Sequence, residues 1–339
     1  MKIMNNKDTS KDDGMIKVSI VIVNYQTAEM TIQCIKSVLD TCDGDWWEVI
    51  VIDNFSNDES CKKIEDFIAA CGAGAKISLI RNQHNGGYSA GNNVGIKLSR
   101  GGHVLLLNSD AVLGENTVEE LSKCLEEDPG IGLASPGLYS VDGKQQNGCF
   151  RYPRPLSELL KAAATGPISR ALRSYDTSVE LSTDRTSPEW TSFACVMIRR
   201  KLFETVGMLD EGFFMYFEDV DFCRRARNSG WSIINNPNVR VIHLGGGSSN
   251  VTSSINLRRR VPKYYYESRS RYYYKYYGHI GLIATNICWT LGFSVASTRK
   301  IMSKEYQPNT CEKQWKDIWI NSLDPTALYT HPDSYQTYP

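Results

Sequence analysis

The 339-residue chain has no excess of charge of either sign, because 38 lysines and arginines balance 38 aspartates and glutamates. A neutral chain has no global field that would attract nucleic acid or repel an acidic substrate. We therefore expect no nucleic-acid partner. Any electrostatic function must come from a local cluster of residues.

The sequence also lacks two patterns that are typical of exported proteins. No apolar run follows the charged residues near the start, so we expect no signal peptide and interpret residues 1–15 as a polar lead-in. The ten cysteines include no CxxC pair. Without export they are expected to be reduced thiols rather than a disulfide framework. These observations predict a cytoplasmic protein.

A dinucleotide-binding fingerprint is missing as well. The nearest match to GxGxxG is GAGAKI, which begins at Gly72 and follows a predicted helix instead of a strand. The fingerprint requires a preceding strand, because the turn from strand to helix holds the pyrophosphate. This absence argues against a nicotinamide-dependent oxidoreductase.

The sequence does contain an alternation of strand and helix patterns. Apolar runs of strand length, most of them rich in β-branched residues, fall at 18–25, 47–54, 76–82 and 102–113. Apolar residues at helical spacing occupy 30–39 and 62–72. This alternation predicts an α/β fold with a mainly parallel sheet flanked by helices. Functional groups in such folds gather at the carboxyl ends of the strands.

The second half of the chain is less regular. Residues 143–188 predict a loop-rich insertion with one helix near 156–164. Ordered elements return as a strand at 193–200, helices at 201–207 and 220–228, and a strand at 237–244. The composition changes abruptly after Asn250.

Several polar residues follow predicted strands and could form a site. Asp53 could accept the N3–H of a uracil or thymine ring, although aspartate is also a common turn residue. The glycines of NGGYSAGNN (85–93) would let a ligand approach the backbone closely, or could form a simple connection. Asp110 and His243 could bind Mg²⁺ or Mn²⁺, although a lone histidine often has a structural role. Composition alone leaves these alternatives open.

The stretch FFMYFEDVDFCRRARNSGW (213–231) places Glu218, Asp219 and Asp221 beside aromatic residues. Acidic side chains in the first turn of a helix can accept from free N–H groups and complement the helix dipole. Alternatively, the aromatic residues could desolvate Asp219 and raise its pKa, which would suit a base that deprotonates a sugar hydroxyl. Asp221 and Arg225, four residues apart, are interpreted as a surface helix pair.

Taken in order, six segments resemble the family 2 glycosyltransferases of the GT-A fold, in particular the rhamnosyltransferase-like branch of bacterial polysaccharide biosynthesis. The segments are VSIVIVNY, VIDNFSND, NQHNGGYSAGNNVGI, LLLNSD, WTSFACVMIRRKLFETVGMLDEGFFMYFEDVDFCRRARNSGW and VRVIHLGGGS. The resemblance implies a GT-A catalytic domain at 16–250 with a Rossmann-like nucleotide-sugar-binding sheet. It also implies a C-terminal helical extension at 251–339.

The resemblance also assigns roles to single residues. Asp219 is implied as the catalytic base, and Glu218 as the residue that orients Asp219 or the acceptor. The implied donor nucleotide site comprises Asn24, Asp53, Asn85, Gly86, Gly87, Gly91, Asn92, Asn108 and Asp110. The implied acceptor contacts are Trp190, Phe217 and Glu218. Asp110 and His243 are implied as ligands of Mg²⁺ or Mn²⁺, and Asn108 stands where a full DxD motif has its first carboxylate.

The implied activity is inverting transfer of a sugar from a UDP- or dTDP-sugar. The acceptor would be a hydroxyl of a glycan, free or linked to polyprenyl diphosphate. The alternative is a non-catalytic nucleotide-sugar or glycan-binding protein of the same fold. Such a protein would have no use for the Glu218 and Asp219 pair.

The C-terminal extension has a composition of its own. Seven lysines and arginines from Arg258 to Lys275 interleave with eight tyrosines, and a charge-free run follows at 276–298. This composition fits a membrane interface, and equally a helical cap on the catalytic domain. The run is rich in serine and threonine, so we expect an interfacial or core-packed helix rather than a span. Because members of the resembled family act on lipid-linked acceptors, we predict peripheral contact at the cytoplasmic face of the membrane.

Overall fold

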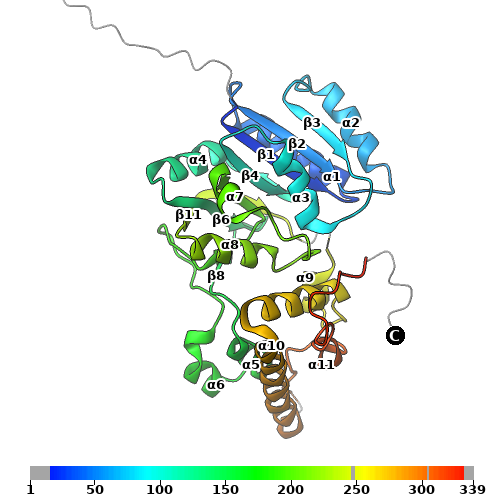
Figure 1. Cartoon of the computed structure of the whole chain (residues 1–339), viewed down its shortest axis with the longest axis vertical. Coiled ribbons are helices and arrows are strands. Elements are labelled where there is room, and N and C mark those ends of the chain that lie inside the picture. The colour runs from blue at the N-terminus through cyan, green and yellow to red at the C-terminus, as the bar shows by residue number, and fades with distance from the viewer. Residues whose placement is uncertain (1–15, 246–248, 304, 332–339) are drawn as a thin grey trace, which may run out of the picture.

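A computed structural model describes residues 16–245, 249–303 and 305–331. The predicted lead-in at 1–15 lies outside the described residues, as does part of the glycine and serine stretch after His243. Figure 1 shows a half built from a sheet and its helices, and a second half made mainly of helices. All ten cysteines are free thiols, as predicted.

The central sheet has nine strands in the order β3-β2-β1-β4-β10-β6-β11-β5, with β7 paired to β6 outside this path. The strands are β1 (Val18–Asn24), β2 (Trp47–Asp53), β3 (Ile77–Arg81), β4 (His103–Asn108), β5 (Ala111–Leu113), β6 (Ile131–Tyr139), β7 (Gln145–Gln146), β10 (Cys195–Arg199) and β11 (Ser232–His243). A separate small sheet pairs β8 (Cys149–Phe150) with β9 (Trp190–Thr191).

The α/β class is confirmed, but the sheet is mixed rather than mainly parallel. Strands β1 to β4 are parallel, as are β6 and β11. Strand β10 is antiparallel to both of its neighbours, and β5 is antiparallel to β11. The long insertion before β10 brings the chain back to the opposite end of the sheet, which reverses the direction of that strand. Sequence alternation alone does not report this reversal.

Helices cover both faces of the sheet because side chains alternate along each strand. Val18, Ile20 and Ile22 of β1 face one apolar cluster, whereas Val21 faces the other. The first cluster includes α1 (Ala28–Thr41), α2 (Ser60–Ala70) and α4 (Thr117–Glu127). The second includes α3 (Gly87–Leu98), α7 (Arg200–Val206) and α8 (Glu218–Asn228).

The helical half combines the middle and the end of the chain. Its elements are α5 (Pro155–Ala163), α6 (Gly166–Ala171), the short 3₁₀ helix η1 (Arg173–Tyr175), α9 (Val251–Asn256), α10 (Lys263–Met302) and α11 (Gln314–Asp317). The helix predicted near 156–164 is confirmed as α5, which packs along α10. Helix α10 bends at Gly278, whose φ of 66° is outside the helical range.

The first half of α10 is an interior element, so the prediction that its basic residues and tyrosines face a membrane is wrong. Tyr264, Tyr266, Tyr272 and Tyr273 are buried in two apolar clusters that also contain Phe213 or Phe214. Five of the seven cations form ion pairs within the chain, which are Arg260 with Asp317, Lys263 with Glu267, Arg269 with Glu158, Arg271 with Asp210, and Lys275 with Asp210 and Asp221. Arg258 and Arg259, which precede α10, are exposed.

Asp221 is likewise buried, and its interpretation as half of a surface helix pair is wrong. Its side chain is fully buried, and it accepts hydrogen bonds from Arg225 Nε at 2.9 Å and from Tyr276 Oη at 2.7 Å. Lys275 Nζ lies 2.7 Å from the same carboxylate. Asp221 therefore ties α8 to the first half of α10. The spacing to Arg225 revealed only one of these partners.

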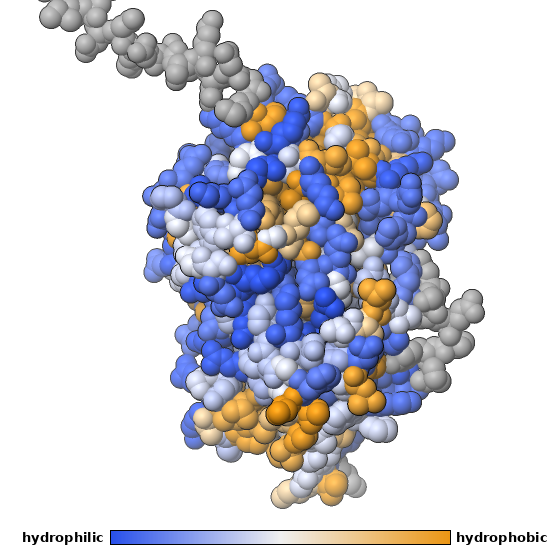
Figure 2. Space-filling view, viewed as in Figure 1, coloured by the Kyte–Doolittle hydropathy of each residue, from blue (hydrophilic) through white to orange (hydrophobic). Residues whose placement is uncertain are grey.

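The second half of α10 exposes an apolar face. Ile280, Ile283, Ile287, Leu291 and Val295 are exposed at helical spacing. In Figure 2 hydrophobic residues gather at the lower end of the molecule, where Figure 1 places this part of α10 with α5 and α6. Among the described residues, α10 is also the helix that is long and apolar enough to cross a membrane by length and composition. We call these five exposed residues the α10 stripe.

The ion pair between Glu158 and Arg269 gives the first prediction. Arg269 Nη2 lies 2.8 Å from Glu158 Oε2, and both residues are buried between α5 and α10. Arg269→Met would leave the buried carboxylate without its main cation, so we expect a loss of about 3–5 kcal/mol in the free energy of unfolding. Denaturant unfolding measures this loss.

The double variant Glu158→Leu with Arg269→Met is the matched control. It removes both charges, so it should recover much of the stability that the single variant loses. Equal stability of the single variant and the wild type would show that this pair does not hold α5 to α10.

Candidate functional site

Strand register brings three of the predicted donor-site residues together. Asn24 lies opposite Asp53 at the ends of β1 and β2, and Val23, next to Asn24, lies opposite Asn108 of β4. Asp53 Oδ1 accepts from Asn24 Nδ2 at 2.7 Å, and Asp53 Oδ2 accepts from Ser56 N at 3.1 Å. The predicted gathering of polar groups at the carboxyl ends of parallel strands is therefore present.

The glycine loop at 85–87 is fastened to the same edge by amide side chains. Asn54 Nδ2 donates to Asn85 Oδ1 at 2.8 Å, and Asn85 Oδ1 also accepts from Gly87 N at 2.9 Å. Gly91 brings α3 close to β1, because a Cβ there would lie 2.9 Å from Val23. These glycines have packing roles, and their contact with a nucleotide stays a prediction. Nearby, Asn92 Nδ2 donates to Tyr88 O at 2.9 Å.

Gly87 joins this loop to the segment that precedes the two carboxylates. Its φ is +80°, and a Cβ there would lie 2.0 Å from Phe214 O. Tyr88 N donates to the same carbonyl oxygen at 2.7 Å. Only glycine fits this backbone conformation at this distance. The glycine loop therefore packs directly against the segment at 213–217.

Asp110 and His243, the predicted metal ligands, lie side by side. The antiparallel pairing of β5 and β11 sets Ala111 opposite His243, and Asp110 Oδ1 lies 3.4 Å from His243 Nε2. A carboxylate and an imidazole can both bind Mn²⁺, and the carboxylate suits Mg²⁺. No cluster of three or more such side chains occurs within 16–245, 249–303 and 305–331. A bound cation would therefore need further ligands from its substrate or from water.

Asn108 adds an unused acceptor beside this pair. Its Oδ1 is buried and has no hydrogen-bond partner in the described part of the chain. Buried polar atoms are nearly always paired. This atom is therefore available to a ligand hydroxyl or to a water molecule at the end of β4. Asn108 can supply a neutral contact where a DxD motif would place a charge.

Glu218 and Asp219 begin α8 after a strained turn. Tyr216 and Phe217 both have φ of 70°, a left-handed conformation that is costly for aromatic residues. The turn leads the chain from the apolar clusters of Phe213 and Phe214 directly into the two carboxylates. Neither carboxylate forms an ion pair within the described residues, and Glu218 Oε2 is buried without a hydrogen-bond partner.

Burial shifts both carboxylates toward their neutral forms. It raises the pKa of Glu218 well above the ordinary value, and the neighbouring charge of Asp219 adds to this effect. Burial also raises the pKa of Asp219 to about 7, although hydrogen bonds from the backbone, including Val220 N at 2.8 Å, oppose the shift. Both shifts favour the protonated forms, and a carboxylate whose pKa is near 7 can act as an acid or as a base at neutral pH.

The two predicted acceptor residues lie in one aromatic cluster beside α8. The Trp190 ring stacks on Phe150 with centroids 4.4 Å apart, and Phe217 contacts Tyr272 at 5.4 Å. Both Trp190 and Phe217 pack at the edge of the cluster that contains Phe213 and Val220. The structure thus brings these residues to the surroundings of Glu218, and their contact with an acceptor stays a prediction.

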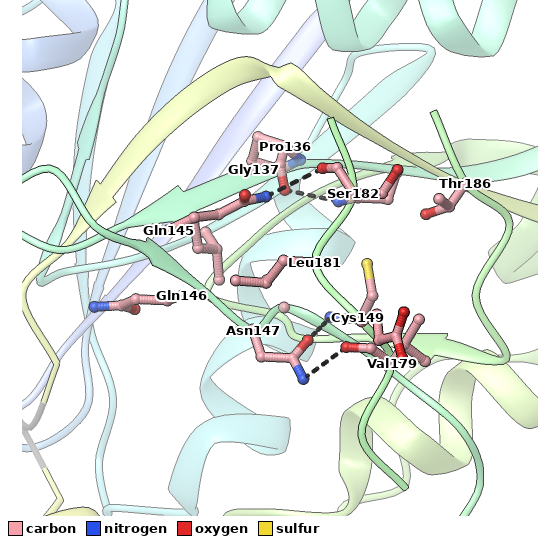
Figure 3. Close-up of a pocket in the computed structure, with 14 residues that line it drawn as sticks. Pro136, Gly137, Gln145, Gln146, Asn147, Cys149, Val179, Leu181, Ser182 and Thr186 are labelled. Carbon is pink, nitrogen blue, oxygen red and sulfur yellow. Dashed lines mark hydrogen bonds between the residues drawn. The ribbon is translucent and has the colours of Figure 1, made fainter. Parts of the chain in front are cut away.

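One cavity lies outside this arrangement. Figure 3 shows it between β6, the residues around β7 and the segment at 179–186, with Gln145, Asn147, Cys149 and Ser182 in its wall. Its volume of about 20 Å³ has room for roughly one water molecule, which is too little for a sugar. None of the predicted site residues lines it.

Tyr88 is a site residue that the sequence analysis did not single out. Its hydroxyl donates to Phe193 O at 2.7 Å. Burial, followed by the charges of Glu218 and Asp219, raises its pKa well above the ordinary value. The tyrosine inside NGGYSAGNN was the available signal, because an aromatic residue in a glycine loop needs a packing partner.

Solved structures with the same fold support this description. The mannosyltransferase PcManGT from Pyrobaculum calidifontis, in complex with GDP-Man and Mn²⁺, aligns with a TM-score of 0.55 at 14% identity over 85% of this chain and 76% of that chain. GalNAc-T7 with UDP, GalNAc and Mn²⁺ aligns with a TM-score of 0.57 at 17% identity over 91% and 56%. At these identities the likeness concerns the fold alone, and the predicted GT-A fold is confirmed.

Sequence comparison identifies the family. The profile described as glycosyl transferase family 2 matches residues 19–222, more than half of the chain. The chain therefore belongs to glycosyl transferase family 2, as its motifs predicted.

Its relatives include hexosyl- and rhamnosyltransferases. The hexosyltransferase Agl10 of low-salt glycan biosynthesis in Haloferax volcanii is 29% identical over 64% of this chain and 63% of its own length. The N-acetylglucosaminyl-diphospho-decaprenol L-rhamnosyltransferase of Mycobacterium tuberculosis is 25% identical over 59% and 63%. The dTDP-rhamnosyl transferase RfbF of Shigella flexneri is 24% identical over 81% and 85%. The match thus spans slightly less than two thirds of the first two relatives.

The raised pKa of Asp219 gives the second prediction. An aspartate that ionises near 3.8 when unfolded and near 7 when folded opposes folding once it is charged. This penalty grows as the pH rises from about 4 to about 7 and is constant above that. Asp219→Asn should therefore melt at a higher temperature than the wild type at pH 8. The difference should shrink as the pH falls toward 4, and a lower melting temperature at pH 8 would instead indicate a capping role.

Proposed function

We propose that the protein is an inverting glycosyltransferase that moves a sugar from a UDP- or dTDP-sugar to a hydroxyl of a glycan or lipid-linked glycan. The observation that carries this proposal is the pair at the start of α8, in which Glu218 is buried, Asp219 is partly buried and the pKa of Asp219 is raised to about 7. A protein that only binds nucleotide sugars would gain nothing from two destabilised carboxylates. The transferases among the relatives and the family 2 membership support the reaction class.

In the proposed reaction Asp219 acts as the general base. It takes the proton of the acceptor hydroxyl while the oxygen forms a bond to the anomeric carbon. The bond from that carbon to the nucleoside diphosphate breaks on the opposite face, so the configuration inverts. Glu218, whose pKa is raised by burial, would orient the acceptor or Asp219. Trp190 and Phe217 would contact the acceptor sugar.

The donor would lie along the strand ends. Asp53, already oriented by Asn24 and Ser56, would accept from the base, and the glycine loop with Asn85 and Asn92 would border the nucleotide. Asp110 and His243 would hold Mg²⁺ or Mn²⁺, with Asn108 beside them. A divalent cation at this position supplies charge neutralisation for the departing diphosphate. The Mn²⁺ in both structural neighbours agrees with this choice.

A panel of nucleotide sugars, scored by released nucleoside diphosphate, tests the activity. With the active donor and its acceptor, Asp219→Asn should lose about 10²–10⁴-fold in rate while binding the nucleotide normally. The rate of the wild type should rise with pH through about 7, because only the ionised Asp219 accepts a proton. Near-normal turnover in Asp219→Asn would refute the assignment, and failure of every donor would favour the binding-protein alternative.

The metal assignment gives a separate prediction. Chelation by EDTA should abolish transfer, and added Mn²⁺ or Mg²⁺ should restore it. Asp110→Asn and His243→Ala should each raise the metal concentration that gives half-maximal activity. His279→Ala, at an exposed histidine of α10 outside the strand-end cluster, is the control and should leave this concentration unchanged. Transfer that is indifferent to EDTA would show that the ligand set is wrong.

The α10 stripe supplies a new basis for the proposed membrane contact. Its five apolar residues are exposed, and the helix carries no charged residue from 279 to 298. Several hydroxyls of this segment are satisfied within the helix, because Thr290, Ser294 and Thr298 each donate to the carbonyl four residues earlier at 2.8–2.9 Å. A face without charges and with such internally bonded hydroxyls suits the interfacial region of a bilayer. The opposite face packs on α5, so we propose that the helix lies on the membrane.

Co-sedimentation with phosphatidylglycerol vesicles tests this contact. The wild type should bind, and Ile287→Glu with Leu291→Glu should not, since charges in the stripe oppose insertion. Val141→Glu, at an exposed residue between β6 and β7, is the control and should bind. Because the stripe is apolar, binding should persist at high salt. If the double variant instead converts a dimer to a monomer in light scattering, with no vesicle binding by the wild type, the stripe is a self-association surface.

A further inference from the structure

The last described residues lie beside the glycine loop, although they are far from it in sequence. After α11 the chain runs back past α10, and in Figure 1 this red segment rises from α11 toward the half that contains the sheet. Residues 329–331, which we call the C-terminal strap, reach the glycine loop and Phe214. They are separated from that loop by more than 240 residues of sequence.

The strap holds two consecutive carbonyl groups of the glycine loop. Tyr329 Oη donates to Gly86 O at 3.3 Å, and His331 Nε2 lies 2.9 Å from Asn85 O. A carbonyl oxygen can only accept, so His331 Nε2 carries the proton in this contact. Together with the bond from Gly87 N to Asn85 Oδ1, these contacts fix the orientation of the peptide groups at 85–87.

The same two side chains also pack on the segment that precedes the carboxylate pair. The Tyr329 ring lies 4.9 Å from the Phe214 ring, and the His331 ring lies 6.0 Å from it at a steep angle. Phe214 is four residues before Glu218, and its carbonyl accepts from Tyr88 N. The strap therefore contacts both the glycine loop and the segment at 213–217.

A buried carboxylate of α10 anchors the strap. Thr330 Oγ1 donates to Glu267 Oε1 at 2.9 Å, and Thr330 N donates to Glu267 Oε2 at 3.1 Å. Lys263 Nζ lies 3.1 Å from Glu267 and donates to Thr330 Oγ1 at 2.6 Å. Glu267 is only 4% exposed, so a charge-assisted network removed from water fixes the residue between Tyr329 and His331.

We propose that Tyr329 and His331 are positioning residues for the nucleotide, which they hold in place through the glycine loop. The inference rests on the proposed function, because the loop is assigned to the donor. The contacts given above join the strap to the glycine loop, to Phe214 and to Glu267, so its loss should weaken donor binding and change the rate at saturating donor little. One hydrogen bond in such a setting corresponds to about 3- to 10-fold in affinity.

Calorimetric titration of the full-length protein with UDP and with dTDP, in the presence of Mn²⁺, tests the proposal. Tyr329→Phe keeps the ring on Phe214 but removes the hydroxyl, and His331→Ala removes the imidazole. Each should raise the Kd of the preferred nucleotide by about 3- to 10-fold. His331→Gln should restore part of the affinity, because its amide can donate to Asn85 O. Leu328→Ala, at a neighbouring residue that is 85% exposed, is the matched control.

The rate of amide hydrogen exchange at residues 85–88, measured without nucleotide, is a second test. It should be faster in His331→Ala than in the wild type or in Leu328→Ala, while melting temperatures stay close. Unchanged exchange and unchanged Kd in both Tyr329→Phe and His331→Ala would overturn the proposal. If the wild type binds neither nucleotide, the proposed function fails, and faster exchange in His331→Ala would still support the hold of the strap on this loop.

Discussion

The architecture around the site depends on one constraint, which is that Glu218 is buried and Asp219 is partly buried, with no ion pair to either carboxylate among the described residues. Two adjacent carboxylates in an apolar setting oppose folding, so the surrounding structure must supply the compensating stability. It does so on several sides. The left-handed turn at Tyr216 and Phe217 directs the chain into α8, and Tyr88 N donates to the carbonyl of Phe214, which only a glycine at 87 leaves room for. The tyrosines of α10 cover the aromatic segment.

The C-terminal region is therefore part of the site and not an appendage. The first half of α10 supplies Tyr264, Tyr266 and Tyr272 to the clusters that contain Phe213 and Phe214. Its ion pairs with Glu158, Asp210 and Asp221 attach it to three separate parts of the domain. A charged residue can enter such an interior only with a partner, and this explains why the basic stretch is interleaved with tyrosine. The composition that resembles a membrane interface is here the composition of a polar, aromatic core.

The bend at Gly278 separates two halves of α10 that have different surroundings. Before the bend the helix packs against the clusters of Phe213 and Phe214, and after it the helix exposes the α10 stripe. The same helix thus connects the residues that cover the segment before Glu218 with the surface proposed to contact the membrane. The strap adds a third link, from Glu267 on α10 to the glycine loop.

The sequence by itself determined the α/β class, the strands that end at Asn24, Asp53 and Asn108, and the family, because these depend on local periodicity and on short motifs. The sequence did not predict strand β6, because Gly132, Pro136 and Gly137 interrupt the pattern of β-branched and apolar residues. It did not predict the direction of β10, because strand pairing is not a local property. Only the tertiary structure set Asp110 beside His243, buried Asp221 against Lys275 and Tyr276, and brought His331 to Asn85. Burial and long-range contacts decide pKa values and partners, and no spacing along the chain encodes them.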